Sequence, residues 1–248
     1  DQGTNQIHIL NEQGDLLEVI DLEGQISKPH MLVFTPDHRF ALTANLGSGD
    51  VTVIRAADRQ VVQTIPTGSG AHAAVPSPDG RSAIVAHTTG QSLVELVYDA
   101  ESETYAVGRS IDLATAPELA DRALFPNNTA ICPAYTADSQ AIYVTLGGGG
   151  LVIVDADSFK ILRAYGADVV EPNGCGLALS PDGKRMYANS GTTKTSEMYI
   201  FDTATHELLF TGETGGLDAH GVLFTPDGRH LITLNRLSDN ATFFSPAS

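Results

Sequence analysis

Residues 173–189 read NGCGLALSPDGKRMYAN, two short apolar runs joined by a Ser-Pro-Asp-Gly turn, with Asn closing the second run. Four more stretches repeat this plan: PHMLVFTPDHRFALTAN from Pro29, AHAAVPSPDGRSAIVAH from Ala71, AICPAYTADSQAIYVTL from Ala130 and AHGVLFTPDGRHLITLN from Ala219. In such a turn, Pro presets the backbone angle and Asp accepts hydrogen bonds from the amides that follow. A pair of strands joined by a tight turn therefore recurs along the chain.

The spacing of these turns indicates the architecture. The turns are anchored at Pro36, Pro78, Ala137, Pro181 and Pro226, and the intervals are 42, 59, 44 and 45 residues. A period in the forties with four short strands per unit is typical of a β-propeller blade. A second turn recurs after the third strand of a unit, where a hydrophobic residue is followed by Asp99, Asp155 or Asp202.

The order of the units predicts which strands are present. Residues 5–22 match only the second half of a unit, and residues 241–245 match a third strand without its fourth. The chain is expected to contain five first strands, five second strands, six third strands and five fourth strands. We therefore predict an all-β protein, a β-propeller of four-stranded antiparallel blades with five blades represented, in one domain over residues 1–248. The ring either closes by pairing the first hairpin with the last strands, or it is a piece of a larger ring that lacks one or two blades.

The long interval carries an insertion at residues 101–128. Within it, residues 117–124 predict one or two helical turns, because Pro117 suits the first position of a helix. We expect this insertion to cap one face of the propeller. Four consecutive glycines, Gly147–Gly150, predict a flexible turn between a second and a third strand.

The charge balance excludes some partners. The chain of 248 residues has 14 Lys and Arg against 30 Asp and Glu, a net charge of -16. This negative field repels phosphate backbones, so we expect no nucleic-acid partner. No run of 18 uninterrupted apolar residues occurs, so we expect no membrane span. An acidic, Gly-rich, Lys-poor surface fits a periplasmic or secreted protein.

The repeat resembles that of the YVTN (YncE-like) β-propeller proteins. The shared features are the turns, the Asn that ends the second strand and the Asp after the third strand. The resemblance covers nearly the whole chain, and it implies an exported propeller, usually of seven blades. The stretch from Ala219, AHGVLFTPDGRHLITLNRLSDNATFF, is also similar to the seven-bladed lactonase propellers of 6-phosphogluconolactonase type.

Two positions depart from the lactonase pattern. That family tends to have Arg directly before the first-strand His, where this chain has Ala219, and Glu after the second-strand Asn, where this chain has Arg236. An anionic lactone would also meet a strongly acidic protein. These departures count against carrying over the family's lactonase activity. The alternative function implied by the resemblance is a lactonase-like hydrolase or lyase acting on a small molecule at the same channel mouth.

One position of the repeat collects residues with ligand chemistry. Six residues before the turn anchor lie His30, His72, Ile131, Cys175 and His220, and Cys132 follows Ile131. First strands are innermost in a propeller and begin at the same end, so these residues should ring one mouth of the central channel. Imidazole and thiolate together suit copper or zinc. The candidate metal ligands are therefore His30, His72, Cys132, Cys175 and His220.

The same residues allow other interpretations. The ring can be a polar channel mouth without metal, and Cys132 and Cys175 can be a disulfide or two buried thiols, of which we favour free thiols. Glu171 and Asp218 precede first strands and could act as general bases. The function predicted from the sequence is an exported binding or scaffold protein, with a small molecule, a metal or a protein partner at the channel mouth. In the alternative, hydrolytic function, a ring histidine would be the base.

Overall fold

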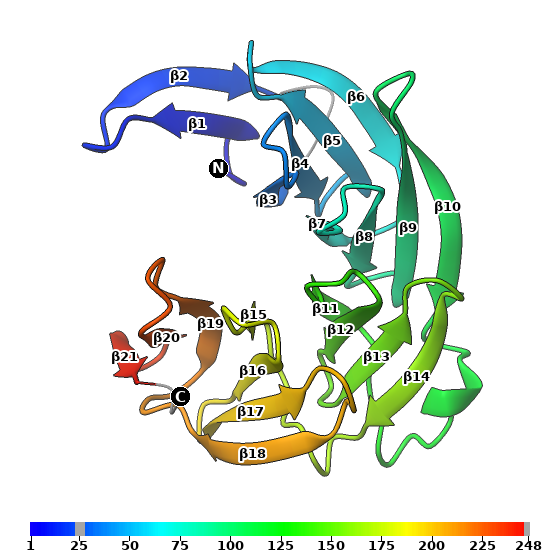
Figure 1. Ribbon diagram of the computed structural model, residues 1–248, viewed down its shortest axis with the longest axis vertical. Coiled ribbons are helices and arrows are strands. Elements are labelled where there is room, and N and C mark those ends of the chain that lie inside the picture. The colour runs from blue at the N-terminus through cyan, green and yellow to red at the C-terminus, as the bar shows by residue number, and fades with distance from the viewer. Residues whose placement is uncertain (23–27, 246–248) are drawn as a thin grey trace. The chain divides into compact units, whose positions relative to one another are not determined.

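The computed structural model describes residues 1–22 and 28–245, and these are built almost wholly of β-strands (Figure 1). The chain divides into two compact units, Asp1–Ser110 and Ile111–Ser248. The prediction of one domain over residues 1–248 stays a prediction. In the part that the structure describes, no helix is long and apolar enough to cross a membrane.

The first unit contains one two-stranded and two four-stranded antiparallel sheets. The two-stranded sheet pairs β1 (Gln6–Leu10) with β2 (Leu16–Asp21). The next sheet contains β3 (Pro29–Phe34), β4 (Phe40–Asn45), β5 (Asp50–Arg55) and β6 (Gln60–Pro66). The last contains β7 (Ala71–Pro76), β8 (Ser82–His87), β9 (Ser92–Asp99) and β10 (Thr104–Asp112).

The second unit contains two four-stranded sheets and one three-stranded sheet. The first is β11 (Ala130–Tyr135), β12 (Ala141–Leu146), β13 (Leu151–Asp155) and β14 (Lys160–Tyr165). The second is β15 (Leu177–Leu179), β16 (Arg185–Gly191), β17 (Ser196–Asp202) and β18 (Leu208–Glu213). The third is β19 (Ala219–Phe224), β20 (Leu231–Asn235) and β21 (Asn240–Phe244).

The predicted strand inventory is confirmed, because every first, second, third and fourth strand expected from the repeat is present among the described residues. β1 and β2 make a sheet of two strands, and β19, β20 and β21 make a sheet of three. Closure of the ring by these two sheets stays a prediction. Within each unit, neighbouring sheets meet at their first strands, β3 with β7, β11 with β15 and β15 with β19 (Figure 1).

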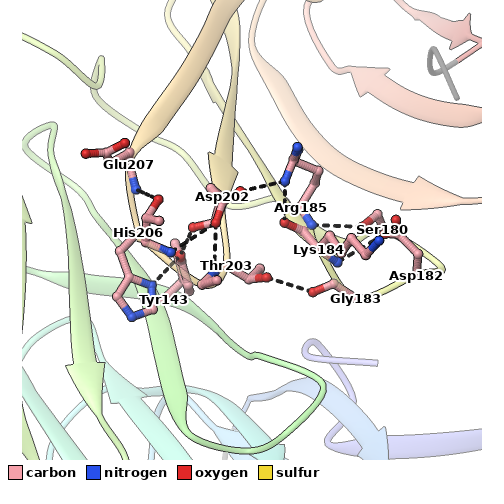
Figure 2. Close-up of polar contacts among 12 residues, drawn as sticks. Tyr143, Ser180, Asp182, Gly183, Lys184, Arg185, Asp202, Thr203, His206 and Glu207 are labelled. Carbon is pink, nitrogen blue, oxygen red and sulfur yellow. Dashed lines mark hydrogen bonds and ion pairs between the residues drawn. The ribbon is translucent and has the colours of Figure 1, made fainter.

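The repeated turns are held by the same set of hydrogen bonds. In the Ser180 turn, the Ser180 hydroxyl donates to Asp182 Oδ1 at 2.6 Å, and the Lys184 amide donates to the same oxygen at 3.1 Å (Figure 2). The turns at Thr35, Ser77, Thr136 and Thr225 repeat this pair of bonds. These donors favour the ionised carboxylate, and at Asp227 they lower the pKa to about 2. The turn aspartates are structural, as the sequence predicted.

The turn after β17 is joined to the Ser180 turn and to the neighbouring sheet. Arg185 Nη1 donates to Asp202 Oδ2 at 2.7 Å, and the Thr203 hydroxyl donates to the Gly183 carbonyl at 2.8 Å. The Tyr143 hydroxyl of β12 lies 2.9 Å from His206 Nδ1 (Figure 2). These contacts tie the β11–β14 and β15–β18 sheets together at the end where the Pro-Asp turns lie.

The insertion is shorter than predicted. Its first part, within residues 101–128, is the fourth strand β10, which follows the Asp99 turn and completes the sheet of β7, β8 and β9. The predicted helical turn is a single 3₁₀ turn, Pro117–Leu119, which packs against β14. Leu119 and Phe125 are buried, and the Asn128 side chain donates to the Leu113 carbonyl at 2.7 Å. A role as a cap stays a prediction.

The hydrophobic core lies between consecutive sheets. Alternate residues of each strand face the next sheet, so the apolar set of one sheet packs on that of its neighbour. One cluster joins the β3–β6 and β7–β10 sheets, a second joins the β11–β14 and β15–β18 sheets, and a third joins β15–β18 to β19–β21. This packing fixes the first strands, and it thereby sets the positions of the candidate site residues.

Candidate functional site

The candidate ligand position lies in β-bulges. In β3, Pro29 pairs with Asn45 and Met31 pairs with Ala44, so His30 is the additional residue of a bulge. The same register shift places His72, the Ile131 and Cys132 pair, and His220 in the bulges of β7, β11 and β19. A bulge re-aims a side chain out of the regular alternation, and bulges are common beside active sites. The common register that the sequence indicated therefore has a structural cause.

In the first unit, the bulges bring two imidazoles together. The rings of His30 and His72 have their centroids 4.0 Å apart at an interplanar angle of 36°. His30 Nδ1 lies 3.1 Å from the His72 carbonyl oxygen. Because a carbonyl oxygen can only accept, Nδ1 carries the proton, and in the neutral ring Nε2 holds the free lone pair. His30 is half-buried, whereas His72 is buried.

A cleft of about 630 Å³ lies beside His30 in the first unit. It is bounded by the sheet of β1 and β2 on one side and by the β3–β6 sheet on the other. Its lining is mainly apolar and includes Ile7, Ile20, Leu32 and Phe34. A volume of this size accommodates a small organic molecule.

His87 is a third histidine at this end of the first unit. It closes β8 as Asn45 and Asn235 close β4 and β20, and Asn189 of β16 is the corresponding residue of the repeat. Its side chain is fully buried, with Nδ1 3.3 Å from the Ser92 carbonyl and Nε2 3.1 Å from the Thr67 hydroxyl. Burial lowers the pKa of His87, so the ring is held neutral. His87 was not among the candidate residues predicted from the sequence, although it is the one histidine at the repeat position where other second strands have Asn.

In the second unit, the corresponding position carries a covalent link. Cys132 and Cys175 form a disulfide, with Cα atoms 5.1 Å apart, and it joins the β11–β14 sheet to the segment that precedes β15. The preference for free thiols is therefore wrong. Residue spacing could not show this, because the two cysteines belong to different repeats and meet only when neighbouring first strands pack. β15 has three residues where the other first strands have six, so the disulfide lies where pairing is shortest.

Glu171 belongs to a polar network around Tyr199. The Glu171 amide donates to the Tyr199 hydroxyl at 2.9 Å, and that hydroxyl donates to Glu197 Oε2 at 2.8 Å. The Thr195 hydroxyl donates to Glu171 Oε2 at 2.6 Å. Burial raises the pKa of Tyr199, so it stays protonated and donates to Glu197. The network fixes the connection between β14 and β15 against β17.

Asp218 has the partner that the sequence analysis did not find. Arg236 donates from Nε to Asp218 Oδ2 at 2.7 Å, and Arg236 Nη2 lies 2.7 Å from the same oxygen. The Asp218 side chain is 6% exposed, whereas that of Arg236 is 67% exposed. The two lie 18 residues apart on either side of β19 and β20, so only the hairpin brings them together. A carboxylate engaged in this way is poorly available as a general base.

The candidate metal ligands are divided between the two units. His30 and His72 lie together in the first unit, Cys132 is bonded to Cys175 in the second, and His220 is exposed on β19. The described residues contain no group of three or more His, Cys, Asp or Glu side chains arranged to hold a metal ion. A copper or zinc site formed by His30, His72, Cys132, Cys175 and His220 stays a prediction, and disulfide formation removes its two thiolates.

The sheets, the turns and the bulged first strands define a β-propeller protein whose polar groups gather where first strands begin. The chain belongs to the family of seven-bladed β-propeller lactonases, whose family model matches residues 11–247. The propeller fold is thus confirmed. The resemblance to the YVTN (YncE-like) repeat stays a prediction. No match was found among curated proteins.

Solved structures support the same fold. Two similar structures are crystal structures of provisionally assigned 6-phosphogluconolactonases, one from Bacteroides uniformis and one from Bacteroides fragilis. Their TM-scores are 0.76 and 0.74, each at 16% sequence identity. The alignments cover 98% of this chain and 74% and 73% of those chains. At this identity, the similarity shows the fold and leaves the substrate to be inferred from the residues of this chain.

Proposed function

We propose that this protein is an exported hydrolase that opens lactones, and that His30 is its general base. Three observations support the proposal: membership of the lactonase family, a polar end where the first strands begin, and the hydrogen bond that fixes the tautomer of His30. The hydrogen bond of His30 is the main support for the proposal, because a general base needs a lone pair that is exposed to substrate and held in place.

The proposed chemistry is addition of water to an ester. His30 Nε2 removes one proton from a water molecule as the water oxygen attacks the lactone carbonyl carbon. The tetrahedral intermediate then collapses, the ring C–O bond breaks, and the ring oxygen leaves with the proton that His30 has held. The product is the open-chain hydroxy acid. The His72 carbonyl holds the His30 ring through Nδ1, so the ring need not reorient between the two proton transfers.

Export is supported by the disulfide. Disulfides persist in oxidising compartments such as the periplasm and the extracellular space, and they are rare in the cytosol. The bond between Cys132 and Cys175 therefore agrees with a periplasmic or secreted protein. The acidic surface, at a net charge of -16, fits the same location.

Hydrolysis of simple lactones by the purified protein tests the proposal. The rate of acid release is followed by a pH indicator and corrected for spontaneous hydrolysis. Replacing His30→Ala should lower kcat by about 10²- to 10⁴-fold, the usual contribution of a general base. A rate in His30→Ala equal to that of the unmodified protein would remove His30 from the mechanism.

His38→Gly is the matched control. His38 lies in the Pro-Asp turn at the opposite end of the β3–β6 sheet, with φ of 57°, where three of the other turns have Gly. Glycine adopts this conformation without strain, so the replacement removes an imidazole and leaves the fold intact. We expect His38→Gly to retain full activity.

A further inference from the structure

We infer that the preferred substrates are lactones with an apolar alkyl substituent, and that this substituent binds in the cleft beside His30. The inference rests on the proposed lactone hydrolysis, because it names the substrate class of the same site. All the residues on which it depends belong to the first unit, Asp1–Ser110.

A row of side chains on β3 connects the proposed base with the apolar part of the cleft. His30, Leu32 and Phe34 are separated by one residue each, and all three line the cleft. At about 3.3 Å per residue, Leu32 lies about 7 Å and Phe34 about 13 Å from His30 along the strand. The substituent of a lactone held at His30 can therefore extend along this row.

The face of the β3–β6 sheet that carries this row is apolar. Leu32 pairs with Thr43, and Phe34 pairs with Ala41, which pairs in turn with Ile54. All five residues line the cleft. The opposite face of the sheet packs on the β7–β10 sheet. A ligand therefore meets the β3–β6 sheet on the face that carries the row.

The β1–β2 sheet supplies the second wall of the cleft. Ile7, Ile9 and Ile20 line it, and Ile7 pairs directly with Ile20. These three side chains are half-buried, and on the other wall Leu32 and Phe34 stay 39% and 51% exposed. Apolar surface between two walls is removed from water when an apolar chain lies between them, and this removal favours binding of the chain.

The charged side chains beside the cleft already have partners within the chain. Apart from histidines, the charged residues in the described lining are Asp1 and Arg59. The Asp1 carboxylate accepts hydrogen bonds from the amides of Gly3 and Thr4 at 2.7 and 3.1 Å, and Arg59 forms an ion pair with Glu18 of β2. A hydroxylated or charged substituent would leave water without gaining a free partner, which is unfavourable, whereas an alkyl chain needs none.

A series of γ-lactones tests the inference, from γ-butyrolactone, which has no substituent, to γ-dodecalactone, which has an octyl chain. The reacting ring is the same in all of them, and each rate is divided by the rate of spontaneous hydrolysis. We expect kcat/KM to rise by up to about fourfold for each methylene group, the factor that full burial of a CH₂ group gives. A kcat/KM that does not rise with chain length would overturn the inference.

A second comparison uses two six-membered lactones, δ-decalactone with a pentyl chain and glucono-δ-lactone with hydroxyl groups. After the same correction, we expect kcat/KM to be about tenfold or more higher for δ-decalactone, because only its substituent gains from leaving water. A preference for glucono-δ-lactone would contradict the assignment of the cleft.

Two variants locate the bound chain along β3. Leu32→Thr should lower kcat/KM about three- to tenfold for γ-octalactone and for longer lactones, because a buried contact with the chain is lost. Phe34→Thr should lower it for γ-dodecalactone alone, since shorter chains do not reach this position. Threonine suits a strand, so both variants should fold. Equal losses on every lactone, γ-butyrolactone included, would show that no chain site exists on this row.

Val62→Thr is the matched control. Val62 of β6 belongs to the same sheet, is 38% exposed and lies outside the cleft. The variant should keep the chain-length dependence of the unmodified protein. A loss on γ-dodecalactone equal to that of Leu32→Thr would mean that the cleft does not bind the chain.

Failure of the proposed function differs from failure of the alkyl specificity. If no lactone is hydrolysed faster than in buffer, the proposed function is wrong and the alkyl specificity falls with it. If γ-butyrolactone and γ-dodecalactone are hydrolysed equally well and His30→Ala abolishes both activities, the proposed function stands and the alkyl specificity is wrong.

Discussion

The two units use the same repeat position, at the end where first strands begin, in different ways. In the first unit, the bulges of β3 and β7 present His30 and His72, which are held by one hydrogen bond and by ring contact. In the second unit, Cys175 at this position is joined covalently to Cys132, which follows Ile131 in the bulge of β11, and an ion pair and a tyrosine network fix the adjoining connections. The first unit places a half-buried and a buried imidazole in contact at this position, and the second uses it for a disulfide between neighbouring sheets and for the exposed His220 of β19.

The difference shows that the residues of the repeat that determine the fold are not the residues that vary in chemistry. The fold depends on the Pro-Asp turns and on the apolar faces between sheets, which are alike in both units. The bulged position is outside that pattern, so a histidine or a cysteine can occupy it without changing the sheet. The following predictions test this comparison.

The largest effect is expected from the disulfide. Replacing both Cys132→Ala and Cys175→Ala removes a crosslink between residues 43 apart in sequence. On the chain-entropy model, closing a loop of this length stabilises a protein by about 4 kcal/mol. We expect the second unit to unfold at a markedly lower urea concentration, while the first unit is unaffected. Hydrogen exchange measured by mass spectrometry can locate the change.

Reduction of the unmodified protein should reproduce this result, and the double variant should not respond to the reductant. Equal protection of β15 in oxidised and reduced protein would show that packing alone holds this strand, and the contrast between the units would lose its main support.

The next effect concerns the ion pair of the second unit. Asp218→Asn keeps a residue that tolerates φ of 55° but removes the charge that Arg236 contacts. Loss of a charge-assisted hydrogen bond at a nearly buried carboxylate should cost about 1.5–3 kcal/mol of unfolding free energy. Asp227→Asn, in an exposed Pro-Asp turn, is the comparison, because its ion pair with Arg229 is solvated. If both substitutions cost the same, the Asp218 pair has no special role.

A smaller, pH-dependent effect is expected in the first unit. Burial lowers the pKa of His87, so the folded chain resists the proton that the unfolded chain accepts near pH 6.5. The unfolded state then binds more protons, and stability is lost as pH falls from about 6.5 toward the lowered pKa of His87. His87→Asn introduces the residue found at this repeat position in other sheets and should reduce this slope.

Urea unfolding at several pH values measures the slope of each unit. The second unit should keep its own dependence in the His87→Asn protein, because burial and Arg163 lower the pKa of His206 there. An unchanged slope for the first unit would mean that His87 is protonated equally in folded and unfolded chains.

The smallest effect concerns metal. Sulfur atoms in a disulfide are not thiolate ligands, so zinc should leave the melting temperature of the oxidised protein unchanged. After reduction, two thiolates with Cα atoms about 5 Å apart could bind zinc together, and a rise of about 2–4 °C would correspond to about 1 kcal/mol. A shift of equal size in the oxidised protein would show that histidines alone bind the metal.

Much of the fold could be predicted from the sequence because its determinants are local. The turn at Pro36 and its repeats place each first and second strand, and the Asp99, Asp155 and Asp202 turns place the third and fourth. The amide bonds to these carboxylates span two or three residues. Turns whose hydrogen bonds join residues so close in sequence can be recognised from the sequence alone. The strand β10 follows the Asp99 turn, but its segment was assigned to an insertion because the interval from Pro78 to Ala137 is 59 residues, whereas the other intervals are 42, 44 and 45.

The site could be predicted only in part because its contacts form only when strands pair or sheets pack. The register of His30 and His72 was visible, but their bulges depend on the pairing of β3 with β4 and of β7 with β8. The disulfide joins residues 43 apart, and Asp218 and Arg236 are opposed only in the folded hairpin. Nothing in the spacing alone distinguishes these pairs from others.

The bulges have a consequence for protein engineering. A bulge residue lies outside the regular alternation of its strand, so replacing it disturbs neither the apolar face nor the register of the sheet. Positions 30, 131 and 220, whose side chains are not buried, are therefore sites where a saturation library should retain a high fraction of folded members. In each unit, such a library varies side chains at the end where first strands begin, so new catalytic activities could be selected on an unchanged scaffold.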